Sequence, residues 1–125
     1  MAKYNILQEK AFAFAIRIVN LYKYLCEEKK EFVLSKQVVR SGTSIGANIE
    51  ECIGGQSDKD FIAKLSIAYK EARETRYWLK LLLATNYISQ EQANSVLQDA
   101  EELCKIMAKI LLTVKNKLNS SSFNS

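Results

Sequence analysis

The chain has 125 residues, of which 48% are hydrophobic and 26% charged, and its net charge is +4. This length and composition predict a single domain with a packed core, and the mild positive charge favours acidic partners. Histidine is absent, which removes the usual general base at neutral pH, the common zinc ligand and every Ser-His or Cys-His nucleophile pair.

Helix-breaking residues are confined to one region. The chain has no proline, and its four glycines lie between residues 42 and 55, so long helices are expected elsewhere. Cys26, Cys52 and Cys104 are far apart on predicted apolar faces, which predicts buried free thiols. Neither a secretion signal nor an apolar run long enough for a membrane span is found in the sequence, so we expect a cytoplasmic protein without a membrane partner.

Two helices are predicted in the first half of the chain. Over about residues 5–30, apolar side chains recur at steps of three and four. They are Leu7, Ala11, Phe14, Ile18, Leu21 and Leu25, with Phe12, Ile16 and Val19 widening the stripe. The charge cluster at 27–31 predicts a solvated end. Ser35 is a candidate N-cap for a second helix that ends at about Ile53, before two glycines.

Two further helices are predicted in the second half. Ser57 is a candidate N-cap for a third helix that continues to about Asn86, and Ser89 with Gln92 has capping-box spacing at the start of a fourth. Four helices with short connectors predict an all-α, up-down-up-down antiparallel four-helix bundle. It is expected to be one domain over residues 1–118, followed by a polar, frayed tail at 119–125.

The apolar surface exceeds the needs of an isolated bundle. The first and fourth helices have wide apolar stripes, and Tyr69, Tyr77 and Trp78 lie outside the main stripe of the third. Such an excess predicts self-association. The alternative is a monomer with scattered surface aromatics.

A polar row follows the second helix beside its apolar row. The polar row comprises Gln37, Ser41, Ser44, Asn48 and Glu51, and the apolar row Val38, Gly42, Ile45, Ile49 and Cys52. In the structural interpretation, Gln37, Ser41, Ser44 and Asn48 hydrogen-bond to other helices, and Gly42, Gly46 and Ala47 let backbones approach closely. Arg40, Glu51, Glu74 and Arg76 then form ion pairs between helices or subunits. In the functional interpretation, the row lines a groove or pore that contacts a ligand or nucleic acid.

Carboxylate pairs are the remaining candidates for chemistry. They are Glu50 with Glu51, Glu71 with Glu74, and Glu101 with Glu102, and none has the Glu-x-x-His pattern of di-iron bundles. Residues 42–46 lack the Gly-Lys-Ser/Thr ending of a phosphate loop. We therefore expect no catalytic residues, metal or cofactor, and an enzyme that uses carboxylates with a metal is the least favoured hypothesis.

Basic side chains supply candidates for nucleic-acid binding. They are Lys3, Lys10 and Arg17, spaced by seven on the first helix, and Lys105, Lys109, Lys115 and Lys117 on the fourth. In a symmetric ring these residues would be repeated, and the modest basic stripe would become a large positive surface for phosphates.

Residues 37–51 and 57–79 resemble the bacterial four-helix bundle proteins encoded in 23S rRNA intervening sequences. That family is similar to the accessory variability determinant of diversity-generating retroelements, a basic bundle that forms a pentameric ring. The resemblance implies a homopentamer without catalytic residues that binds RNA or DNA. Where the family usually reads Asn-Ile-Ala-Glu-Gly, this chain has Glu50 and Cys52 at the third and fifth positions.

Two functional hypotheses follow. The first is a non-enzymatic, ring-forming scaffold or adaptor that binds structured RNA. The second is a protein-interaction module that docks a partner protein, such as a polymerase, without contacting nucleic acid.

Overall fold

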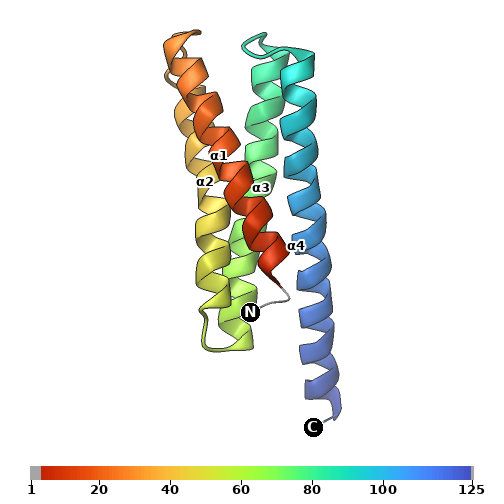
Figure 1. Ribbon diagram of the computed structural model, residues 1–125. Coiled ribbons are helices and arrows are strands. Elements are labelled where there is room, and N and C mark those ends of the chain that lie inside the picture. Colours follow the sequence, from red (N-terminus) through yellow and green to blue (C-terminus); the bar gives the residue numbers. More distant parts are fainter. Residues whose placement is uncertain (1–3, 125) are drawn as a thin grey trace.

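The computed structural model describes residues 4–124, and the side chains of residues 4–120. It contains the helices α1 (Asn5–Glu27), α2 (Leu34–Ile53), α3 (Asp58–Ala84) and α4 (Gln90–Asn124). Each helix runs antiparallel to the one before it (Figure 1), so the predicted all-α four-helix bundle is confirmed. None of these four helices combines the length and the apolar character that a membrane span requires.

The four helices do not pack equally. α2 contacts α3 most extensively, whereas the contacts between α1 and α4 are the sparsest among neighbouring pairs. Figure 1 shows why: α1 runs obliquely across the bundle and approaches α4 near the N-terminal end of α1. At its C-terminal end α4 extends beyond the other helices. Leu112 of α4 is 62% exposed, whereas its neighbour Leu111 is buried.

The apolar rows of all four helices meet in one core. Their largest fully buried side chains are Phe14, Ile18, Leu25, Val38, Ile45, Ile49, Leu65, Leu79, Leu82, Leu103 and Met107. The apolar rows predicted for the first two helices are therefore confirmed over most of their length, because side chains spaced by three and four share one helix face. Cys52 and Cys104 are buried free thiols as predicted, while Cys26 is only half-buried. Burial raises the pKa of the Cys52 thiol to about 11.

The helix ends follow two predicted capping signals. Ser57 accepts a hydrogen bond from the Asp60 backbone N–H at 3.1 Å. Ser89 and Gln92 form the reciprocal capping box, with distances of 2.8 and 3.1 Å. α3 ends where Asn86 adopts a positive φ of 67°, a conformation that asparagine tolerates better than most residues.

The prediction for the start of α2 is wrong. Ser35 lies inside the first turn, and its hydroxyl does not cap the helix. Instead, the Glu31 carboxylate accepts the backbone N–H groups of Val33, Leu34 and Ser35 at 3.1, 3.0 and 2.7 Å. Glu31 is only 8% exposed, so it is not part of a solvated end. A carboxylate suits this position because the first-turn amides lack carbonyl partners within the helix.

The C-terminus also differs from the prediction. Residues 119–124, expected to form a frayed tail, are the last residues of α4. Serine and asparagine are weak helix formers, but without glycine or proline here the sequence has no strong stop signal.

Candidate functional site

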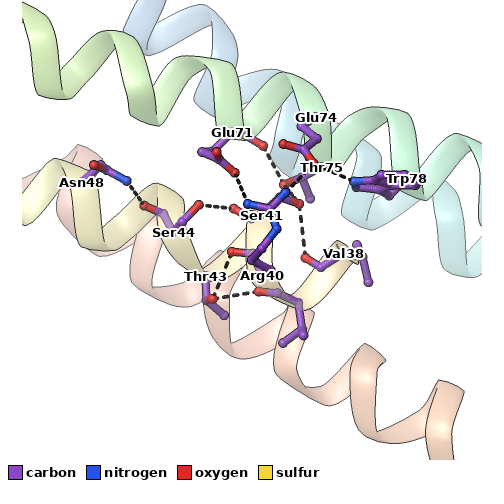
Figure 2. A network of polar contacts seen from close by, with 11 residues as sticks. Val38, Arg40, Ser41, Thr43, Ser44, Asn48, Glu71, Glu74, Thr75 and Trp78 are labelled. Carbon is purple, nitrogen blue, oxygen red and sulfur yellow. Dashed lines mark hydrogen bonds and ion pairs between the residues drawn. The ribbon is translucent and has the colours of Figure 1, made fainter. Parts of the chain in front are cut away.

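A buried hydroxyl pair joins α2 to α3. Ser41 Oγ lies 2.8 Å from Thr75 Oγ1, and both residues are completely buried. Thr75 Oγ1 is also 2.7 Å from the Glu71 carbonyl oxygen in its own helix. Figure 2 shows this pair at the centre of a polar network that extends along both helices. The polar row therefore does cross between helices at Ser41, as the structural interpretation predicted.

The rest of the polar row behaves differently. The Ser44 hydroxyl donates to the Ser41 carbonyl oxygen, and the Asn48 amide donates to the Ser44 carbonyl oxygen, each at 2.9 Å. The predicted hydrogen bonds from these two residues to other helices are therefore wrong. Gln37 is exposed and forms no side-chain hydrogen bond with any described residue. Short polar side chains reach the carbonyls of their own preceding turn, and these local partners satisfy Ser44 and Asn48.

Arg40 links the surface of α2 to two carboxylates of α3. Its guanidinium lies 3.3 Å from a Glu71 oxygen and also pairs with Glu74. Trp78 Nε1 donates to the same Glu74 oxygen at 3.1 Å (Figure 2). Partial burial opposes ionisation of Glu74, but hydrogen bonds from Trp78 and Arg40 lower its pKa overall.

Of the other two residues predicted to form ion pairs, Glu51 forms one among the described residues and Arg76 does not. Glu51 pairs with Lys64 of α3 at 3.0 Å, so α2 and α3 are joined a second time near the end of α2. Arg76 forms no ion pair with any residue between 4 and 120. The ion pairs of Arg40, Glu51 and Glu74 thus connect helices of one chain.

Close packing of α1 against α2 occurs at one glycine. A Cβ atom added to Gly42 would lie 2.7 Å from Ile18 Cγ2, whereas one added to Gly46 would lie 3.7 Å from the Ala11 Cβ. Ala47 is exposed, so its predicted role in close helix approach is wrong. Of the three small residues, only Gly42 is required by the spacing of the helices.

The two residues of α1 predicted to bind nucleic acid are already paired. Lys10 Nζ lies 2.8 Å from Glu102 Oε1, and Arg17 Nη1 lies 2.5 Å from Asp99 Oδ2. The hydrogen bond and charge of Glu102 raise the pKa of Lys10. Lys3 is outside the described residues. The heptad spacing of α1 therefore places Lys10 and Arg17 against α4, where carboxylates reduce their availability to phosphates.

The four lysines predicted on α4 remain available. Lys105, Lys109, Lys115 and Lys117 are exposed and form no ion pair within the described part of the chain. Lys105 borders a hollow that also includes Arg76 of α3, whereas Lys109 and Lys117 border another, lined by Phe61.

A second basic surface lies on α3. An open hollow of about 600 Å³ is lined by the cationic side chains Lys70, Arg73, Arg76 and Lys80, by Glu71 and Glu74, and by Tyr77. We call these seven residues the α3 hollow. Lys70 and Arg73 are not among the residues predicted from the sequence to bind nucleic acid. Their three-and-four spacing with residues 77 and 80 is the signal that would have found them.

Groups of three or more histidine, cysteine or carboxylate side chains suited to a metal ion are not found among the described residues. The polar network and the basic surfaces are therefore the candidate sites.

Comparisons with known proteins place the chain in a family. Residues 3–109 match the model of the 23S rRNA-intervening sequence protein. The chain is also similar to the crystal structure of a protein with unknown function from the S23 ribosomal protein family of Bacteroides thetaiotaomicron. The two are 56% identical, with a TM-score of 0.86, and the match covers 87% of this chain and 97% of that one. No curated protein matches. The chain belongs to the 23S rRNA-intervening sequence protein family.

Proposed function

We propose that this protein is a non-enzymatic, oligomeric scaffold or adaptor of the cytoplasm that binds structured RNA. The observation that carries RNA binding is the distribution of unpaired cations. The carboxylates of α4 neutralise Lys10 and Arg17 of α1, while four lysines of α4 and the cations of the α3 hollow have no ion-pair partner among the residues that the structure describes. Phosphates are attracted to clustered cations that are not already paired, because their binding releases counterions.

Self-association is the second part of the proposal. Phe12 and Ile16 of α1 are 69% and 49% exposed, and they lie one helical turn apart. Contact between subunits would cover this apolar surface. A ring would also repeat the basic surface of each chain, whose net charge is only +4. The choice of five subunits rests on the resemblance to the accessory variability determinant.

Native mass spectrometry and RNA binding test the two parts separately. We expect a pentameric mass, and binding of an RNA hairpin that weakens as salt rises from about 50 to 200 mM. Replacing Lys105 and Lys109 with alanine should lower the salt slope by about 2. The matched control replaces Lys10 and Arg17, which removes equal charge from paired side chains and should have a smaller effect. A monomer contradicts the ring, and salt-independent binding contradicts the phosphate contacts.

A second candidate function is docking of a partner protein, such as a polymerase, without direct RNA contact. The exposure of Phe12 and Ile16 favours it, since an apolar surface suits a protein partner as well as a second subunit. A protein that assembles but does not bind RNA at low salt would support this candidate over the first.

A further inference from the structure

We propose that the α3 hollow is a platform for single-stranded RNA, on which Tyr77 stacks an unpaired base while the surrounding cations bind the neighbouring phosphates. The inference rests on the proposed RNA binding and adds to it the class of RNA segment that this surface selects. Unpaired segments of this kind occur in the loops of structured RNA.

Tyr77 is accessible for stacking. Its side chain is 59% exposed in the α3 hollow, which is an unusual position for a large aromatic residue on an otherwise charged surface. The ring also contacts the Trp78 ring, with centroids 5.1 Å apart and planes at 73°. The neighbouring ring restrains Tyr77 but leaves most of its surface free for a base.

A series of contacts connects this ring pair to the bundle interior. Trp78 donates to Glu74, and Glu74 is held by Arg40 from α2 (Figure 2). Arg40 is next to Ser41 in α2, and the Ser41 hydroxyl bonds to Thr75 in the bundle interior. A ring that is positioned before binding loses less conformational entropy when a base stacks on it.

The cations have the arrangement that a phosphate backbone requires. Lys70, Arg73 and Lys80 lie seven and four residues before Tyr77 and three after it, so they share its helix face. From Lys70 to Lys80 the helix rises about 15 Å. Positive charge therefore lies on both sides of the ring along α3, and Arg76 adds to it beside the ring.

The carboxylates of the hollow cancel only part of this charge, because with Arg40 the five cations outnumber the two carboxylates. Glu71 and Glu74 are both paired with Arg40, which belongs to α2 and is not among the lining residues. Hydrogen bonds from Trp78 and Arg40 also lower the pKa of Glu74, so this carboxylate stays ionised and paired. The four cations of the hollow thus face incoming phosphates without a direct ion-pair partner among the described residues.

An exposed aromatic ring favours single strands over duplexes. In an RNA duplex the bases stack on one another and are not available to a side chain, whereas unpaired bases stack readily on aromatic residues. Phosphate contacts alone would bind both forms. A preference for the single strand is therefore the property that the tyrosine adds.

Trp78 offers a direct measurement, because it is the only tryptophan of the chain and touches Tyr77. Fluorescence titration of the full chain would use an oligouridylate of about 12 nucleotides and an RNA duplex of similar length. We expect the single strand to change Trp78 emission and to bind more tightly. Tyr77→Ala should weaken single-strand binding about tenfold and leave duplex binding unchanged.

Two variants serve as controls. Tyr77→Phe keeps the aromatic ring and should retain single-strand binding. Phe32→Ala removes another exposed aromatic side chain, 52% exposed and outside the α3 hollow, and should have no effect. Affinities of the two tyrosine variants are best measured by anisotropy of a labelled RNA, since the Trp78 signal itself depends on Tyr77.

The outcomes separate this inference from the proposed function. If Tyr77→Ala binds the single strand as tightly as the wild type, the platform is refuted while RNA binding stands. If neither RNA form binds at low salt, the proposed function fails as well. A changed native mass of Tyr77→Ala would assign the hollow to a subunit contact and overturn the platform.

Discussion

Glu31 acts as the N-terminal cap of α2 from three residues before the helix. Its carboxylate accepts three backbone N–H groups and is almost fully buried. Burial opposes ionisation, but these hydrogen bonds lower the pKa of Glu31 overall. A lowered pKa in the folded state means that the ionised form stabilises the fold above the usual value of 4.5, and that this stability is lost as the pH falls through the folded-state pKa.

Replacing Glu31 with alanine should therefore lower the free energy of unfolding by about 1–2 kcal/mol at neutral pH. The difference from the wild type should shrink as the wild-type carboxyl is protonated in acid. Urea denaturation, followed by circular dichroism at neutral pH and again at an acidic pH below the pKa of Glu31, measures this change. Glu28→Ala removes an exposed carboxylate from the same charge cluster and should have an effect within about 0.5 kcal/mol. Equal effects of the two variants would rule out the capping role.

Gly42 and Gly46 differ in the space beside them, although both lie in the middle of α2. A methyl group on Gly42 would overlap the completely buried Ile18, whose branched side chain has little freedom to move. We expect Gly42→Ala to destabilise the protein by about 1–3 kcal/mol. Gly46→Ala should instead stabilise it by up to about 1 kcal/mol, because alanine favours helix formation and the space is sufficient. Thermal unfolding of the two variants compares them, and a stable Gly42→Ala protein would contradict the close contact.

At the scale of elements, α2 and α3 are the best-connected pair. Their apolar rows pack along both helices, and the Ser41 and Thr75 hydroxyls bond in the middle of that contact. Arg40 adds ion pairs beside this hydrogen bond, and Glu51 adds another near the C-terminal end of α2. By contrast, α1 meets α4 over a short length, through ion pairs whose side chains are 40–52% exposed. Such exposed pairs contribute little to stability, so we expect the α1–α4 contact to be the weaker one.

Thr75→Val tests the central hydrogen bond of the α2–α3 contact. Without the threonine hydroxyl, Ser41 retains only a long, 3.4 Å hydrogen bond to the Val38 carbonyl oxygen. Leaving a buried hydroxyl poorly paired should cost about 1–2 kcal/mol. Thr113→Val is the control: it removes an exposed hydroxyl that bonds only to its own helix, at Lys109. Chemical denaturation should show a clear loss for Thr75→Val alone, and similar values for both variants would show that the pair is unimportant.

At the scale of the whole molecule, the hydrophobic core is well packed, but part of the surface is apolar. The apolar rows are buried, yet large apolar side chains of α1 remain exposed, including Phe12 and Ile16. A single chain therefore forms a packed core and still has an apolar surface available for association. The basic residues of α3 and α4 lie on other helices, which allows self-association and RNA binding to use different surfaces.

Association through α1 predicts a specific response to mutation. Changing Phe12 and Ile16 together to serine should lower the native mass toward that of a monomer, because the apolar area that drives association is lost. Helix content should not change, since neither side chain is buried. Ile67→Ser, on α3 and 42% exposed, is the matched control and should retain the assembled mass. An unchanged mass for the α1 double variant would exclude this surface as the subunit contact.

The sequence by itself determined the helices, their inner rows and two of their caps. Phe14, Ile18, Ile45 and Ile49 are buried as predicted, because helical periodicity depends only on near neighbours along the chain. Ser57 and Ser89 cap as predicted for the same reason, since each bonds within three residues.

Only the tertiary structure decided which polar groups meet. Ser41 bonds to Thr75, and Arg17 pairs with Asp99, far away in the sequence. Ser44 belongs to the same polar row as Ser41, yet its hydroxyl bonds to a carbonyl oxygen of its own helix. Whether a polar side chain bonds locally or across helices depends on the angle and distance at which the helices pack. The packing angle and distance depend on the whole core, so they cannot be read from a local pattern of residues.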